Sequence, residues 1–318
     1  MPEGGYSVEI ENLVKRFGSF VAVDRINLAI RKGEVFGFLG PNGAGKSTTI
    51  RMLCGLLRPT EGRATVAGFD VARRPEAVRQ NIGYMSQKFS LYNDLKVIEN
   101  IRLFAGLYSV DSKELNGRIE WTLEMADLKG QEQLITGTLP GGWKQRLALG
   151  CAVLHKPPII FLDEPTSGVD PISRRRFWEL IHQMAAEGVT VFVTTHYMEE
   201  AEYCNRLALI FRGKIVALGT PSELKQSAMK GELLLVECTP LGSALEILQS
   251  APGVIDAAVF GNALHLTVKD AAKAALELKS YLAERSVAVS RIERIRPSLE
   301  DVFVSLTTER SAKQEQRP

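Results

Sequence analysis

The stretch Gly40-Pro-Asn-Gly-Ala-Gly-Lys-Ser47 decides the fold. A short apolar run, 33–40, leads into it, and apolar residues recur at helical spacing over 48–57. A Gly-x-x-x-x-Gly-Lys-Ser motif between a strand and a helix is typical of a phosphate-binding loop, because glycines let backbone N–H groups turn toward an anion. Lys46 can then reach the β- and γ-phosphates of a nucleotide, and the Ser47 hydroxyl suits Mg²⁺. The motif's length and context disfavour the alternative, a Gly-rich turn in a Rossmann-like unit.

The chain's length and composition predict a two-domain globular protein. Its 318 residues exceed what one hydrophobic core usually supports, and 45% hydrophobic with 24% charged residues is ordinary for a soluble protein. A net charge of +2 gives no sign of nucleic-acid binding. No apolar run is long enough for a transmembrane helix, and the N-terminus lacks the pattern of an export signal. The four cysteines are far apart, which disfavours a zinc site and points to the cytosol.

An aromatic residue upstream of the loop is a candidate for base stacking. Segments 8–13 and 22–30 alternate as half-buried antiparallel strands do, with 15–18 as the turn between them. Phe17 lies in this turn, and an adenine can stack on the apolar face of its ring. A core or turn aromatic is the alternative at this position.

Two carboxylates end a buried strand. The apolar run 157–164 closes with Asp163 and Glu164, as expected for a central parallel strand whose C-terminal end faces a ligand. Adjacent side chains on a strand point opposite ways, so Asp163 is placed to serve Mg²⁺ through water and Glu164 to orient or deprotonate a nucleophile. The next buried strand, 189–196, ends in His196 at the same edge, which favours a γ-phosphate contact over a purely structural histidine.

The segment between these strands contains further candidate loops. A short strand, 82–87, ends in Gln87, and the region from 88 to about 155 is predicted to be mostly helical. At 139–149 a Gly-Gly loop runs into a helix, which is either an anion-binding shape or a plain turn. Asp170 followed by Pro171 suits the N-cap and first turn of a helix.

The character of the chain changes near residue 225. Segment 230–308 reads as β-α-β-β-α-β, which resembles a ferredoxin-like split unit, and a final helix opens at Ser298 with a capping pattern. This segment contains no phosphate, metal or nucleophile motif, so a docking or dimerisation role is expected. The polar tail 309–318 is predicted to be disordered.

Together these motifs resemble the ATP-binding-cassette (ABC) ATPases over residues 6–225. The resemblance implies an α/β fold: a P-loop NTPase core with an antiparallel β subdomain and a helical subdomain at about 88–155, followed by the small α+β ferredoxin-like domain at 230–308. The wider pattern resembles the bacterial type 2 ABC class that exports drugs and antibiotics. The features that carry this are 40–50, Ser90-Leu-Tyr-Asn-Asp-Leu95, Thr166-Ser-Gly-Val-Asp-Pro171 and Pro297-Ser-Leu-Glu-Asp-Val-Phe303.

The resemblance also implies roles for individual residues. It assigns nucleotide binding to Phe17, Gly40, Pro41, Asn42, Gly43, Ala44, Gly45, Lys46, Ser47 and Thr48. It assigns catalysis to Lys46, Gln87, Glu164 and His196. Mg²⁺ is expected at Ser47, Gln87 and, through water, Asp163, and the D-loop contains Ser167 and Asp170. The signature segment, which in this family closes over the ATP of a second cassette, is Leu139, Pro140, Gly141, Gly142 and Trp143.

The signature departs from the family's Leu-Ser-Gly-Gly-Gln. Pro140 cannot donate the hydrogen bond that the family's serine hydroxyl gives to the γ-phosphate. Losing one hydrogen bond to a charged group costs about 1.5–3 kcal/mol, a roughly ten- to hundred-fold effect on rate. The glycine N–H groups and the helix dipole remain, so we expect a weakened site. The partner is then either a cassette with an intact signature or a second copy of this chain.

The predicted function is an ATP-binding and ATP-hydrolysing subunit of an exporter for a drug-like or lipid-like substrate. Separate membrane permeases are the expected partners, contacted at about 87–107, and no nucleic acid is expected. Phe89 and Tyr92 are candidates for this contact, with core packing as the alternative for both. The chain would then lie in the cytoplasm, peripheral on the inner face of the membrane. One alternative, a DNA-repair or translation cassette, usually has coiled coils or tandem cassettes, which this sequence lacks. The other is a weakly hydrolysing regulatory cassette, which Pro140 favours and the remaining motifs oppose.

Overall fold

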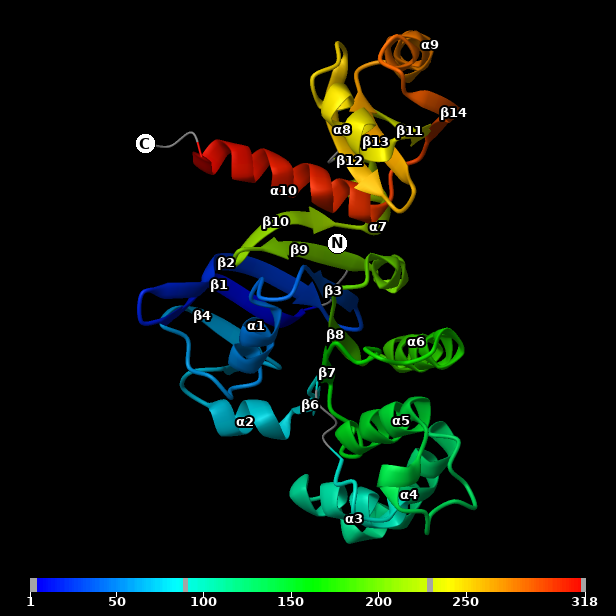
Figure 1. The fold of residues 1–318 in the computed structure, drawn as a ribbon. Coiled ribbons are helices and arrows are strands. Elements are labelled where there is room, and N and C mark those ends of the chain that lie inside the picture. Colours follow the sequence, from blue (N-terminus) through cyan, green and yellow to red (C-terminus); the bar gives the residue numbers. More distant parts are fainter. Residues whose placement is uncertain (1–4, 88–90, 228–230, 316–318) are drawn as a thin grey trace. The chain divides into compact units, whose positions relative to one another are not determined.

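The computed structural model describes residues 5–87, 91–227 and 231–315, with side chains to 308, and divides into two compact units. The first is Met1–Leu218 and the second is Gly219–Pro318 (Figure 1). This division lies earlier in the chain than the predicted boundary near 225, because helix α7 (Pro221–Ser227) contacts α10 (Leu299–Glu315) and so belongs with the second unit.

The first unit contains two sheets and a helical region. Its elements in chain order are β1 (Tyr6–Phe17), β2 (Phe20–Arg31), β3 (Val35–Leu39), α1 (Lys46–Leu53), β4 (Glu61–Val66), β5 (Phe69–Asp70), α2 (Pro75–Gln80), β6 (Ile82–Met85), α3 (Val97–Leu107), α4 (Ser112–Met125), the 3-10 helix η1 (Thr136–Thr138), α5 (Gly141–Ala152), β7 (Ile159–Asp163), α6 (Pro171–Ala186), β8 (Thr190–Thr195), the 3-10 helix η2 (Met198–Tyr203), β9 (Arg206–Phe211) and β10 (Lys214–Gly219).

The smaller sheet of this unit has the strand order β2-β1-β4-β5, and its sequential neighbours are antiparallel. The predicted turn at 15–18 is shorter than expected, because β1 continues to Phe17, which lies opposite Phe20, and only Gly18 and Ser19 turn. Strands β4 and β5 and helix α2 were not predicted from the sequence. Gly62, inside β4, and Gly68, between β4 and β5, have positive φ values of 77° and 80°, and β5 is only two residues long, so this stretch lacks a clear alternating pattern.

The larger sheet has the order β10-β9-β3-β8-β7-β6, with parallel pairing from β9 through β6. Every residue of β3, β7 and β8 is buried, as expected for parallel strands covered on both faces. Phe36, Phe38 and Phe161 surround Phe192 with ring centroids 5.4–5.8 Å from it. This rigid core fixes the C-terminal ends of β3, β7 and β8 at one edge, where the phosphate loop, the carboxylates and His196 follow.

Helices α3, α4 and α5 gather beyond β6 (Figure 1). Their shared core includes the buried Ile101, Leu123 and Leu147. The predicted Gly-Gly loop is wrong in its detail: both glycines lie inside the first turn of α5, and Pro140 is the N-cap with φ −55° and ψ 151°. Proline fits there because its fixed φ suits a helix start and its missing N–H would have no helical partner.

The second unit confirms the ferredoxin-like order. It contains α7, β11 (Glu232–Thr239), α8 (Leu241–Gln249), β12 (Val254–Phe260), β13 (Ala263–Val268), α9 (Ala271–Ala283), β14 (Ala288–Ile295) and α10. Its sheet order is β12-β13-β11-β14 with antiparallel neighbours, and α8 and α9 bury apolar faces such as Leu248 and Leu278 in its core. The prediction that 309–318 is disordered is wrong as far as Glu315, because α10 continues to that residue. The segment has no glycine and no proline before Pro318, so nothing in it stops a helix.

Within the parts of the chain that the structure describes, none of the helices has both the length and the apolar character needed to cross a membrane.

Candidate nucleotide-binding site

The glycine loop between β3 and α1 is already shaped as a cradle. Gly43 and Gly45 have φ values of 80° and 109°, which side-chain-bearing residues rarely adopt. A Cβ on Gly45 would also lie 2.5 Å from the carbonyl oxygen of Ala22. Lys46 is 4% exposed, and its Nζ donates to the carbonyl oxygens of Gly40 at 2.7 Å and Pro41 at 3.2 Å. The ammonium group is therefore held beneath the loop, close to where a bound phosphate would lie.

Asp163 ends β7 next to this loop and is 2% exposed. Its Oδ1 accepts hydrogen bonds from Ser47 Oγ at 3.1 Å and from Thr194 Oγ1 at 2.7 Å. A serine hydroxyl and an aspartate carboxylate beside a phosphate loop are oxygen donors of the kind that Mg²⁺ prefers. Ser47, at the start of α1, and Asp163, at the end of β7, are two of the predicted metal-binding residues, and they are thus in direct contact.

Glu164 is the point on which the other predicted catalytic residues converge. Its Oε1 lies 3.2 Å from Lys46 Nζ, and both side chains are almost fully buried. Its Oε2 accepts from Gln87 Nε2 at 3.0 Å and lies 3.1 Å from His196 Nδ1. The residue has a positive φ of 49°, an uncommon backbone conformation outside glycine. The structure therefore brings Lys46, Gln87 and His196 into direct contact with one carboxylate.

A hollow of about 390 Å³ opens at this point. It is lined by Phe20, Ala22, Asn42, Gly43, Gly45, Lys46, Ser47, Thr48, Gln87 and Glu164. The glycine cradle, the buried ammonium and the paired oxygen donors fit a nucleotide polyphosphate with its metal ion.

Phe17 is not among the residues that line this hollow. It is 50% exposed, and Lys15 Nζ lies 5.1 Å from the centroid of its ring. Phe20, its register partner across the β1–β2 hairpin, is 62% exposed and does line the hollow. The exposed rings of Phe17 and Phe20, at the tip of one hairpin, are therefore both available to stack on a base, whereas the sequence predicted only Phe17.

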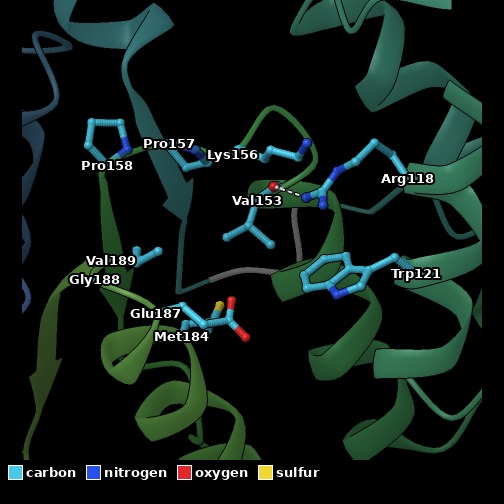
Figure 2. Close-up of a pocket in the computed structure, with 10 residues that line it drawn as sticks. All are labelled: Arg118, Trp121, Val153, Lys156, Pro157, Pro158, Met184, Glu187, Gly188 and Val189. Atoms are coloured by element: carbon cyan, nitrogen blue, oxygen red, sulfur yellow. Dashed lines mark hydrogen bonds between the residues drawn. The ribbon is translucent and has the colours of Figure 1, made fainter. Parts of the chain in front are cut away.

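A second hollow of about 390 Å³ lies between α4 and the start of β8 and does not suit a polyphosphate (Figure 2). Its Arg118 donates to the carbonyl oxygens of Val153 at 2.8 Å and Leu154 at 2.7 Å, and its guanidinium lies over the ring of Trp121. Glu187 adds a negative charge to the lining. The Arg118 guanidinium is committed to carbonyl groups, and the other cation of the lining, Lys156, is paired with Glu114, so this hollow lacks the anion-binding character of the glycine loop.

The segment after Glu164 is tied to the region after His196. Thr166 Oγ1 donates to Glu200 Oε1 at 2.5 Å, and Arg174 Nε lies 3.4 Å from the same oxygen. The Arg174 guanidinium lies 4.6 Å from the ring centroid of Tyr197, whose ring lies 4.1 Å from that of His196. Glu200 is 1% exposed, so the cluster connects the segment of the predicted D-loop with that of His196 through a buried carboxylate.

The two predicted D-loop residues have separate local partners. The Ser167 N–H donates to the carbonyl oxygen of Glu164 at 3.2 Å. Asp170 caps α6 by accepting from the Ser173 N–H at 2.9 Å, and this hydrogen bond holds the pKa of the Asp170 carboxyl below its ordinary value of 3.8.

Beneath the site, burial and then the nearby Asp163 carboxylate raise the pKa of the Cys54 thiol, so Cys54 stays protonated.

The five signature residues differ in their exposure. Leu139 and Gly142 are buried, and Trp143 packs against the core of the helical region. Pro140 and Gly141 are exposed at the N-terminus of α5. Only these two of the five present their surface fully to solvent, at the end of the helix where backbone N–H groups are unpaired.

Sequence reasoning missed Phe20, Thr194 and the Thr166–Glu200–Arg174 cluster. Thr194 could have been predicted from the sequence, because it lies two residues before His196 and side chains two residues apart on a strand share a face. The cluster had none, since its members are brought together only by the packing of α6 and η2.

Comparisons with known proteins agree with this geometry. Residues 23–167 match the family described as ABC transporter, and residues 219–307 match the family described as ATP-binding protein DrrA1-3-like, C-terminal domain. The probable multidrug ABC transporter ATP-binding protein YbhF of Escherichia coli (strain K12) is 52% identical over 225 residues, which are 71% of this chain and 39% of that protein. The daunorubicin resistance ATP-binding protein DrrA2 of Streptomyces coeruleorubidus is 37% identical over 311 residues, 96% of this chain and 97% of that protein. The chain thus spans less than half of YbhF and almost all of DrrA2.

Solved structures resemble the first part of the chain. One described as the ATP binding subunit of an ABC transporter has a TM-score of 0.63 and 29% identity, covering 69% of this chain and 92% of that chain. A dimeric ATP-binding cassette in a post-hydrolysis state, bound to ADP and Pi, has a TM-score of 0.61 and 28% identity, covering 67% of this chain and 98% of that chain. With the site geometry, these similarities show that the chain belongs to the ABC transporter ATP-binding proteins.

Proposed function

We propose that this chain hydrolyses ATP, together with Mg²⁺, to drive the export of a drug-like or lipid-like compound through separate membrane permeases. The observation that carries the proposal is the convergence of Lys46, Gln87 and His196 on the buried Glu164 beside the glycine loop. Relatives named for multidrug and daunorubicin resistance support the substrate class. The chain would work at the inner face of the membrane.

In this proposal Glu164 is the base that takes a proton from the attacking water. Its carboxylate pairs with Lys46 in the structure, and the phosphates of incoming ATP compete for that ammonium group. Release from Lys46 frees a carboxylate oxygen to accept the proton, while His196 and Gln87 keep the side chain in place. Ser47, Gln87 and, through water, Asp163 would hold Mg²⁺, which offsets the charge of the phosphates.

Two exposed regions are proposed as interfaces. Pro140 and Gly141 at the start of α5 would meet the ATP bound by a second cassette, either a copy of this chain or a homologue with an intact signature. Permease contact is proposed from Tyr92, in the segment before α3, to Leu107 at the end of that helix; the two side chains are 51% and 66% exposed. Asn100 supports this region, because its side chain bonds both backbone groups of Tyr92. Phe89, the other candidate, lies outside the described residues.

A second candidate function is a regulatory cassette that binds ATP and turns over slowly. Pro140 favours it, since the N-cap of α5 has no side-chain hydrogen bond to offer a phosphate or its own helix. The complete set of contacts around Glu164 favours the hydrolytic function.

The test is the change Glu164→Gln. A glutamine amide keeps the shape of the side chain but cannot accept the proton, so hydrolysis should fall at least a hundred-fold while ATP stays bound. Retained ATP is measured by passing the nucleotide-loaded protein over a desalting column and identifying the bound nucleotide. The matched control is Glu187→Gln, the same chemical change in the hollow of Figure 2, which should hydrolyse ATP as the wild type does. Undiminished hydrolysis by Glu164→Gln would contradict the assignment.

A further inference from the structure

We propose that Thr194 is a positioning residue that holds both acidic residues of the nucleotide site and thereby sets the Mg²⁺ requirement for ATP binding. The inference deepens the proposed function and rests on it. It assigns a role to the hydroxyl of a strand residue that lies outside the loops expected to contact nucleotide.

Thr194 occupies a central place in the large sheet. Strand β8 lies between β3, which leads into the glycine loop, and β7, which ends in the carboxylates. In the register of these strands, Thr194 is opposite Phe38 on one side and Asp163 on the other. The residue is fully buried, so its hydroxyl must find its partners within the protein.

One hydroxyl serves both carboxylate residues. Thr194 Oγ1 donates to Asp163 Oδ1 at 2.7 Å and accepts from the Glu164 N–H at 3.1 Å. A hydroxyl has one proton and two lone pairs, so the two bonds can coexist. Donation to Asp163 orients the oxygen such that a lone pair faces Glu164. The Glu164 N–H also reaches the carbonyl oxygen of Thr194 at 3.0 Å, so Glu164 has a second anchor.

The two acids depend on this hydroxyl to different degrees. Within the described structure, Asp163 Oδ1 accepts hydrogen bonds from Thr194 and Ser47. The Ser47 hydroxyl would also face the metal ion through a lone pair, whereas the Thr194 hydroxyl is committed to the two acidic residues. Thr194 is therefore the donor whose only task at this site is to keep the carboxylate oriented. Glu164 keeps its carbonyl anchor when the hydroxyl is lost, so its positive-φ conformation is less affected. The main consequence of losing the hydroxyl should therefore appear at the Mg²⁺ site.

The neighbouring threonine provides a matched control. Thr195 is 1% exposed, and its Oγ1 accepts from the Tyr197 N–H at 3.0 Å. Thr194→Val and Thr195→Val make the same chemical change, one residue apart, in the same buried strand. Thr194→Ser keeps the hydroxyl and serves as the conservative rescue.

The experiment is equilibrium binding of a fluorescent ATP analogue to the full chain over a Mg²⁺ titration, and again in EDTA. Thr194→Val should need about ten-fold more Mg²⁺ for half-maximal binding, because one hydrogen bond to a charged group is lost. Its affinity in EDTA should match that of the wild type, which a general loss of structure would not allow. Thr194→Ser and Thr195→Val should titrate as the wild type. A wild-type Mg²⁺ response in Thr194→Val, or an equal shift in Thr195→Val, would overturn the inference.

Two further comparisons keep the result decisive. If Thr194→Val does not fold, Thr194→Ala and Thr194→Ser are compared instead: a ten-fold difference in Mg²⁺ requirement supports the inference, and equal requirements overturn it. Failure of the proposed function at the nucleotide site has a different appearance: the wild type would show no Mg²⁺-dependent binding of the analogue, or would bind it without hydrolysing ATP. Failure of this inference alone leaves wild-type binding intact and Thr194→Val indistinguishable from it.

Discussion

Glu164 shows how single residues at this site are specified by their surroundings. Its charge is balanced by the buried ammonium of Lys46, and its second oxygen meets Gln87 and His196. Burying a carboxylate is costly unless it is paired and hydrogen-bonded, so this set of partners explains how a 5% exposed glutamate is tolerated.

At the residue scale we predict that Pro140→Ser raises the rate of ATP hydrolysis. A serine at this N-cap adds a hydroxyl that can donate to a phosphate on a partner cassette, worth roughly ten- to hundred-fold in rate. The same hydroxyl can accept from an N–H of the first turn of α5 and stabilise the chain by about 0.5–2 kcal/mol. Steady-state phosphate release and thermal unfolding measure the two effects. Pro140→Ala, which relieves the proline but adds no hydroxyl, is the control, and equal rates for the two variants would refute the prediction.

Residues of the phosphate loop and the carboxylate strand could be predicted from the sequence because local spacing places them. Lys46 follows its glycines directly, and Asp163 and Glu164 end an unbroken apolar run. Thr194 has a local signal, its place two residues before His196, but its contacts with Asp163 and Glu164 follow only from strand register, since those residues are distant in the chain. Phe20 follows from the register of the β1–β2 hairpin, in which it pairs with Phe17. The roles of the predicted site residues stay predictions until the variants are measured.

Elements α5 and α6 meet through the second signature glycine. A Cβ on Gly142 would collide with the side chain of Ser173 in the first turn of α6, whereas a Cβ on Gly141 would meet nothing within 4 Å. The two glycines of one helical turn therefore have different tasks. Gly142 allows the N-termini of α5 and α6 to approach each other. Gly141 leaves the exposed surface at the start of α5 free of a side chain.

We predict accordingly that Gly142→Ala destabilises the chain by about 1–3 kcal/mol through overpacking. Gly141→Ala should be neutral or slightly stabilising, because alanine is the better helix former. Thermal or urea unfolding of the two variants beside the wild type makes the comparison. A Gly141→Ala variant as unstable as Gly142→Ala would show that the α5–α6 contact is not the cause.

At the element scale, strands and helices with clear periodicity were predictable, and elements set by tertiary contacts were not. The β-α-β-β-α-β order of the second unit could be predicted because its strands and helices have clear periodicity, and β12 and β13 are adjacent in the chain and pair directly. Strand β5 was missed because it has only two residues, and β4 because only Ala64 and Val66 of its six residues are buried, which gives no clear alternation. The start of α5 was placed late because two glycines and a proline ordinarily indicate a loop.

At the scale of the whole molecule, each unit has its own hydrophobic core. The second unit also has a polar anchor, a set of hydrogen bonds that joins a helix to its sheet. In the second unit, Asp301 at the start of α10 joins the helix to the sheet: its Oδ1 accepts from His265 Nδ1 at 2.6 Å and its Oδ2 from Ser298 Oγ at 2.6 Å. Burial alone would raise the pKa of Asp301, but the hydrogen bonds from His265 and Ser298 outweigh it and hold the pKa below the ordinary value of 3.8.

This pKa direction predicts an acid-sensitive anchor. Because the pKa of Asp301 is lower in the folded state, its stabilising contribution is complete above the unfolded pKa and is lost as the pH falls through the folded pKa. Below about pH 4 the wild type should therefore lose stability faster than Asp301→Asn, whose amide does not titrate. Thermal unfolding of the full chain from pH 7 to pH 3 tests this. Glu300→Gln, an exposed change in the same helical turn, should follow the wild type; parallel curves for Asp301→Asn and the wild type would contradict the prediction.

The most direct test of the central claim is the rate of Mg²⁺-dependent phosphate release from ATP by the purified chain and by its Glu164→Gln variant. It is measured for each alone and after mixing with a permease and a second cassette of the same transporter. We predict release by the wild type, alone or only in the mixture, and none above background for Glu164→Gln under the same conditions. Wild-type rates in the variant, or no release by the wild type in any mixture, would contradict the claim that Glu164 drives ATP hydrolysis here.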